Sequence, residues 1–167
     1  MKFTEYYHSA LRHLETCQLM FEKLSTIDNN KPLLAKKQRL KLDIYYLSGY
    51  IVETMLSYAF FANIKWNKNV DIDKCSLYTK DFKTHKLESK LFFVCSRGKC
   101  DFSGIKLVGV KPENKIEKRM FHEWSEVVRY QNPKTCSQLE FTEHELKCYL
   151  NDIKVMFEQI RNKFYVW

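Results

Sequence analysis

The sequence has few residues that bend a chain, and it lacks a long uninterrupted apolar run. Only four Gly and three Pro occur in 167 residues, which disfavours a sheet-rich fold with many tight turns. The most apolar stretch, residues 40–62, is interrupted by Asp43, Ser48, Glu53, Thr54 and Ser57. Because a membrane-spanning helix needs about twenty largely uninterrupted apolar residues, we expect no membrane span.

Patterns for secretion and for metal binding are also missing. Residues 1–15 contain acids and histidines and lack the apolar core of a secretory signal, so a cytoplasmic location is expected. In that compartment the six Cys are expected to be reduced thiols. Cys95 and Cys100 bracket the loop CSRGKC, but no second paired spacing of Cys or His accompanies them, as a zinc site would need. We therefore predict no metal and no cofactor.

Positive charge is concentrated in the middle of the chain. The formal net charge is +8, with +3 in residues 31–64, +6 in residues 65–115 and −1 in residues 1–30. A localised basic surface is typical of proteins that bind phosphate polymers. A solvated lysine-rich surface without a nucleic-acid role would have the same composition. The charge therefore allows a nucleic-acid partner without identifying one.

Apolar residues recur at three- and four-residue steps, the period of an α-helix, in five segments. We expect helices at Thr4 to Leu24, Leu40 to Ala62, within residues 81–94, from Pro112 to about Asn132, and from a capping box at Thr142 to about Phe164. The second helix is apolar on most of its circumference, so it belongs at the centre of a bundle. The predicted fold class is all-α, with residues 1–167 forming a single domain, an up-and-down bundle of four to five helices.

Two residues are unusual on the central helix. Glu53 is its only acid after Asp43, and Gly49 is its only glycine. On a helix with little solvent to face, they mark a buried carboxylate and a place where another element can approach closely.

Two segments interrupt the helical pattern. Residues 63–80 are polar and are expected to form a long connection. Three of the four glycines fall between Gly98 and Gly109. This density predicts an irregular loop or a small hairpin around residues 98–110, the only place where we expect extended structure.

Three short motifs resemble those of a known family. They are IYYLSGYIVETMLSYAF in the central helix, THKLESKL in the third helical segment and WSEVVRY near the end of the fourth. In their order and style the chain resembles the HEPN family, the higher-eukaryote and prokaryote nucleotide-binding domains. The resemblance implies a helical bundle that often forms a homodimer. It also implies binding of a nucleotide, an RNA or a partner protein such as a small nucleotidyltransferase.

Many HEPN proteins are metal-independent ribonucleases of toxin-antitoxin or phage-defence systems, in which a catalytic His follows an Arg by one to two helical turns. Here Arg129 occupies the position of the family arginine, but the next histidine is His144, beyond Pro133 and a new helix cap. Arg119 and His122 are too close together to match. We therefore predict a binding module without a clear catalytic motif. A ribonuclease with a divergent active site is the alternative.

Candidate site residues follow from the needs of metal-free RNA cleavage, which are a base, an acid and a cation. His85 and Arg129 are the tentative catalytic residues, and Tyr130 or Glu53 would aid them if the helices face each other. Alternatively, His85 is a helix-start histidine bonded to a backbone carbonyl, and Arg129 pairs with Glu53 or Glu126. We expect Glu53 and Arg129 to approach each other, because an unpaired buried charge is costly. The candidate ligand-binding residues are Arg129, Tyr130, Glu53 and Tyr50.

Overall fold

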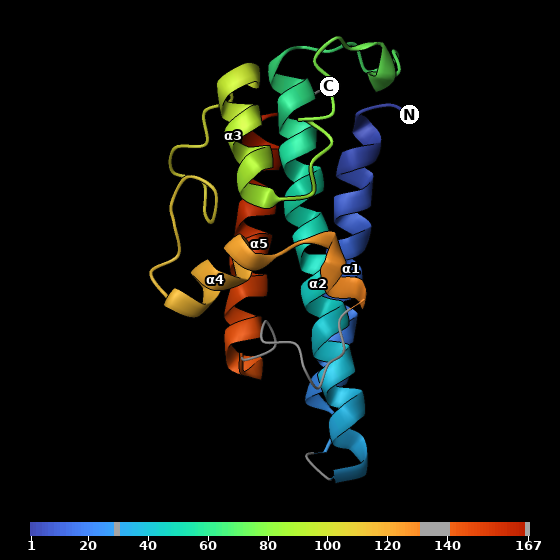
Figure 1. Ribbon diagram of the computed structural model, residues 1–167, viewed down its shortest axis with the longest axis vertical. Coiled ribbons are helices and arrows are strands. Elements are labelled where there is room, and N and C mark those ends of the chain that lie inside the picture. Colours follow the sequence, from blue (N-terminus) through green and yellow to red (C-terminus); the bar gives the residue numbers. More distant parts are fainter. Residues whose placement is uncertain (29–30, 131–140, 166–167) are drawn as a thin grey trace.

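The computed structural model describes residues 1–28, 31–130 and 141–165, in which the regular elements are helices and no strand occurs. The α-helices are α1 (Thr4–Ser25), α2 (Lys31–Asn63), α3 (Leu87–Gly98), α4 (Lys115–Glu123) and α5 (Glu143–Lys163), shown in Figure 1. Two short 3-10 helices are η1 (Ile72–Lys74) and η2 (Glu126–Tyr130). The prediction of an all-α helical bundle is confirmed.

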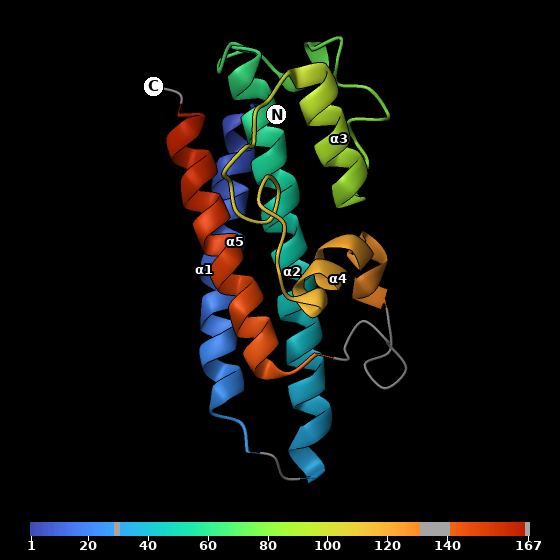
Figure 2. The same ribbon diagram turned by 90° about the vertical axis from the view of Figure 1, so that its left-hand side faces the viewer.

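Helix α2 is the centre of the bundle. Between Ile51 and Phe61 every side chain except that of Thr54 is buried. Helix α1 packs along one side of α2, and α3 and α5 contact other sides (Figure 2). Because neighbours surround α2, a sequence that is apolar on most faces of the helix leaves few apolar side chains in water.

The helices do not simply alternate in direction. Helix α1 runs opposite to α2, whereas α3 and α5 both run in the same direction as α2 (Figures 1 and 2). The connection formed by residues 64–86 returns the chain along α2 before α3 begins, and residues 99–114 turn it back again before α4. These returns bring the segment before α3, and η2 after α4, against α2, while α4 itself packs on α5 and α3.

Helices α2 and α3 begin at different places from those predicted. Helix α2 already starts at Lys31, with Pro32 in its first turn, where a missing backbone N–H costs nothing. Helix α3 starts only at Leu87, so Thr84 and His85 precede the helix. His85 therefore lies on an irregular segment that can turn its side chain toward α2.

The predicted fourth helix is divided in two. Helix α4 follows Asn114, whose side chain accepts a hydrogen bond from the Ile116 N–H at 2.8 Å, and it ends before Trp124, whose backbone is extended (ψ 133°). The chain then forms η2, which buries Val128 and leaves Val127 exposed. The prediction of one continuous helix from Pro112 to about Asn132 is wrong beyond Glu123.

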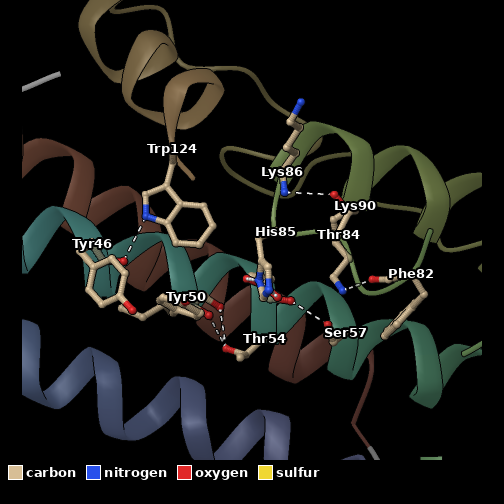
Figure 3. A network of polar contacts seen from close by, with 12 residues as sticks. Tyr46, Tyr50, Thr54, Ser57, Phe82, Thr84, His85, Lys86, Lys90 and Trp124 are labelled. Atoms are coloured by element: carbon tan, nitrogen blue, oxygen red, sulfur yellow. Dashed lines mark hydrogen bonds and ion pairs between the residues drawn. The ribbon is translucent and has the colours of Figure 1, made fainter. Parts of the chain in front are cut away.

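The break in this helix allows the Trp124 ring to pack on Gly49. Trp124 is fully buried, and its Nε1 donates a hydrogen bond to the Tyr46 carbonyl at 3.1 Å. A Cβ placed on Gly49 would lie 1.9 Å from the indole atom Cε2. Figure 3 shows the ring lying against α2 beside Tyr46. The glycine is therefore the close-packing position that the sequence indicated.

The segment of residues 99–114 is irregular, apart from one isolated β-bridge. Its Lys106 N–H donates a hydrogen bond to the Gln159 side chain at 2.8 Å, and Asp101 forms an ion pair with Lys163 at 2.8 Å. Both partners lie on α5, so the loop is fixed against that helix. The sequence prediction of an irregular loop is confirmed.

The five described cysteines are unpaired thiols. Burial raises the pKa of both Cys17 and Cys100 to about 12, which keeps these thiols protonated and unreactive. Within the part of the chain that the structure describes, no group of three His, Cys, Asp or Glu side chains is placed to hold a metal ion. None of the described helices combines the length and the apolar content that a membrane crossing requires.

Gly49→Ala should destabilise the protein, because the added Cβ would clash with a Trp124 ring that is held in place by its bond to Tyr46. We expect the free energy of unfolding to fall by about 1–3 kcal/mol, the range for overpacking a core, even though alanine is the better helix former. Denaturant unfolding measures this change. In a Trp124→Phe background the smaller ring leaves room, so the same substitution should cost less. If Gly49→Ala lowered the free energy of unfolding equally in both backgrounds, the clash with Trp124 would not be the cause.

Candidate functional site

The side chain of His85 lies over α2 and contacts the buried carboxylate of Glu53. Its Nδ1 is 3.1 Å from Oε1 and 3.0 Å from Oε2 of that carboxylate. Glu53 is 9% exposed, whereas the His85 side chain is 45% exposed. In Figure 3 the His85 ring lies between Trp124 on one side and Lys90 on the other. The pair therefore joins the core of the bundle to its surface.

This geometry determines which nitrogen of His85 faces outward. An ionised carboxylate can only accept hydrogen bonds, so Nδ1 donates its hydrogen to Glu53. In the neutral ring, Nε2 then keeps a lone pair on the side away from the carboxylate. Carboxylate–histidine pairs of this kind orient an imidazole so that one nitrogen is presented to a ligand or to a reacting proton.

Aromatic rings form one wall beside His85. The ring of Tyr50 meets that of His85 edge-on, with 6.3 Å between the centroids. Burial, a hydrogen bond with Tyr46 and the negative charge of nearby carboxylates, including Glu53, raise the pKa of the Tyr50 phenol. Tyr50 is therefore protonated at neutral pH, and this wall offers hydroxyl groups without adding charge.

Lys90 is a buried cation on the other side of His85. It is 2% exposed, its Nζ donates a hydrogen bond to the Phe82 carbonyl, and the same atom lies 3.9 Å from the centre of the Phe82 ring. Burial lowers the pKa of the ammonium group to about 8, while the charge of Glu53 acts in the opposite direction. Lys90 therefore places positive charge in the field of the buried carboxylate.

An open groove of about 1170 Å³ lies in front of His85. Its walls are the segment before α3, one face of α3 and the start of η2. Three of the cations that line it come from the same short segment as His85, and all three are exposed. The cations are Lys80, Lys83, Lys86 and Arg97, and the acids are Asp81, Glu88 and Glu126.

The ion pair predicted between Glu53 and Arg129 is wrong. The carboxylate contacts His85 instead, and Arg129 is exposed on η2 with its guanidinium 5.7 Å from the centre of the Tyr130 ring. Neither Arg129 nor Tyr130 is among the described residues that line the groove. Of the predicted site residues, the structure thus brings Glu53, Tyr50 and His85 together. Only His85 is among the described residues that line the groove, beneath which Glu53 holds its ring.

The sequence interpretation missed Lys90 and the lysines that flank His85. Lys90 lies three residues after Leu87 and four before Val94, both of which are buried. A lysine at such a position of an apolar stripe indicates a buried charge, and this signal was present in the sequence. The closeness of Lys90 to Glu53 has no sequence signal, because it arises from the packing of α3 on α2.

No family model, no curated protein and no solved structure matches the chain. The HEPN resemblance, which rests on three short motifs, therefore stays a prediction. The function is inferred below from the geometry and charge of the groove in front of His85.

Lys90 should contribute stability that rises with pH in the alkaline range. Its pKa in the folded state is about 8, against 10.5 as the ordinary value, so between these values the folded state binds fewer protons than the unfolded chain. The contribution of Lys90 to stability should therefore increase across this window, by at most roughly 3 kcal/mol, whereas the raised pKa values of the Cys17 and Cys100 thiols act in the opposite direction. Denaturant unfolding of wild type and of Lys90→Met from about pH 7.5 to about pH 10 isolates the Lys90 contribution as the difference between the two proteins.

With rising pH, wild type should gain stability relative to Lys90→Met, whereas Lys86→Met, at an exposed position four residues earlier, should have the same pH profile as wild type. The same pH profile in wild type and in Lys90→Met would show that Lys90 is not the titrating group.

Proposed function

We propose that the chain is a HEPN-like module that binds RNA in the groove in front of His85. The observation that carries the proposal is the position of His85 between the exposed Lys83 and Lys86, with its ring held from beneath by Glu53. Ammonium groups attract phosphates, and an oriented imidazole adds a directional hydrogen-bond partner. The net charge of +8 supports the same partner.

A polymer suits this groove better than a single nucleotide does. Its volume of about 1170 Å³ exceeds the roughly 300–1,000 Å³ of typical small-ligand pockets. Its cations extend from Lys80 in the segment before α3 to Arg97 near the end of that helix. A chain of regularly spaced phosphates can contact several of them at once, whereas one nucleotide reaches few.

A homodimer is part of this proposal, as the HEPN resemblance implies. Aromatic residues make up 15% of the chain, and Tyr130 and Val127 on η2 are exposed. Exposed aromatic side chains are favoured at the centres of protein interfaces. The masses of the free protein and of its RNA complex, both from light scattering, give the number of chains in each.

Replacing Lys80 and Lys86 together by Gln should weaken RNA binding and reduce its dependence on salt. Each phosphate contact contributes about 0.7 to the slope of log K against log salt for a single strand, so the slope should fall by roughly 1.4 if both lysines contact phosphate. Fluorescence anisotropy of a labelled RNA over a salt series measures both effects.

The matched control removes the same charge outside the groove, with Lys147→Gln and Lys154→Gln on the exposed side of α5. Equal weakening by both pairs of substitutions would place binding elsewhere on the surface. An unmodified protein that binds no RNA at moderate salt would overturn the proposal.

A metal-independent ribonuclease is the second candidate function, and the Glu53–His85 pair favours it. Nε2 of His85 would take the proton of a ribose 2′-hydroxyl as the 2′-oxygen forms a bond to phosphorus. The bond from phosphorus to the 5′-oxygen then breaks, and that oxygen takes a proton from water. The lysines beside His85 would stabilise the negative charge on the phosphorus centre.

If this second function holds, His85→Gln should reduce cleavage by about 10²- to 10⁴-fold, the usual contribution of a general base. Glu53→Gln should reduce it less, because the ring loses its orientation but keeps Nε2. The measurement is the appearance of 2′,3′-cyclic phosphate ends on a labelled RNA in the presence of EDTA. Lys154→Gln serves as the control and should cleave normally. An unmodified protein that binds RNA without cleaving it would eliminate this candidate and leave the binding module.

A further inference from the structure

Phe92 is an aromatic side chain that the fold leaves in water. It is 75% exposed on α3, more than any other described large side chain without a polar atom, while the adjacent Phe93 is 9% exposed. An exposed phenylalanine contributes little to stability, since the hydrophobic effect scales with the apolar area removed from water. Its position therefore calls for an explanation outside the packing of the bundle.

Phe92 forms the ridge between two concave surfaces. On one side is the groove in front of His85, and on the other is a pocket of about 180 Å³ that Phe92 also lines. The floor of this pocket is apolar and includes Leu91, Val108 and Phe121, from α3, the irregular segment and α4. Figure 1 shows that segment on the outer side of α3. The pocket is smaller than a typical drug-sized site, so it suits one planar ring system.

The edge of this pocket is polar and carries positive charge. Exposed Lys111 and Lys118 line it, and the carboxylate of Glu88, which also lines it, contacts Nδ1 of His122 at 2.5 Å. Cations thus lie on both sides of the Phe92 ridge. A partner that fits must combine repeated negative charge with flat apolar rings.

We propose that Phe92 is a stacking platform for an unpaired base, and that the pocket beside it receives a base of single-stranded RNA. The inference rests on the proposed RNA binding and names its substrate class. Proteins that bind single strands combine a cationic groove with aromatic side chains on which successive bases stack. In a duplex the faces of the bases are already stacked on each other, so the ridge selects single strands.

The test compares a single-stranded RNA with a duplex of the same sequence, using anisotropy at fixed salt, for wild type, Phe92→Leu and Phe92→Trp. Phe92→Leu should weaken binding of the single strand by about tenfold or more and leave duplex binding unchanged. Phe92→Trp should retain single-strand binding, because it keeps an aromatic face. Leu19→Ala, at an exposed apolar position on α1, is the control and should change neither affinity.

A 2-aminopurine base in the single strand reports stacking directly, through quenching of its fluorescence. Quenching by wild type and by Phe92→Trp, with loss in Phe92→Leu, would support the inference. RNA binding that is equal for both strand types and insensitive to Phe92→Leu would overturn it and leave the proposed function standing. No RNA binding by wild type would overturn both. If in that case Phe92→Leu converts a dimer into a monomer, the ridge is a surface for a second copy of the chain instead.

Discussion

A carboxylate inside the most buried helix is the constraint on which the site depends. An ionised Glu53 would cost several kcal/mol if it were unpaired in the core. His85 contacts both of its oxygens, and the buried Lys90 adds positive charge from α3. To place His85 there, the chain must leave α2, return along it through residues 64–86 and delay the start of α3 until Leu87. The parallel direction of α2 and α3 and the geometry of the site therefore have the same origin.

Much of the fold could be predicted because burial of α1, α2 and α5 imposes a helical period over many residues. The capping box at Thr142 is present, since it is encoded within four residues: the Thr142 side chain accepts from the Glu145 N–H and the Glu145 carboxylate accepts from the Thr142 N–H. The end of α4 was not predictable in this way. Its apolar pattern continues through Trp124, and the helix stops because the indole packs on Gly49, which lies far away in the sequence. Where a tertiary contact competes with local periodicity, the local signal is misleading.

The site was predictable in its residue types more than in its pairings. Glu53 and His85 were chosen for their chemistry, and they are in contact. The partner assigned to Glu53 was Arg129, because both were the main charges on apolar helices, but the end of α4 puts Arg129 on an exposed 3-10 turn. Which cation meets a buried acid depends on how helices pack, and one sequence does not contain that information.

The same groups help to decide between binding and cleavage. Cleavage requires a base, and Nε2 of His85 is suitably presented. Cleavage is also faster with an acid that can protonate the leaving oxygen, and the candidate acids near His85 are unsuitable. Tyr50 holds its proton too tightly, because burial and neighbouring negative charge raise its pKa. Lys90, with a pKa of about 8, would suit the task by its acidity, yet it is buried against Phe82 and is not among the described residues that line the groove. If RNA is the ligand, as proposed, the described groups thus favour holding the strand over cutting it.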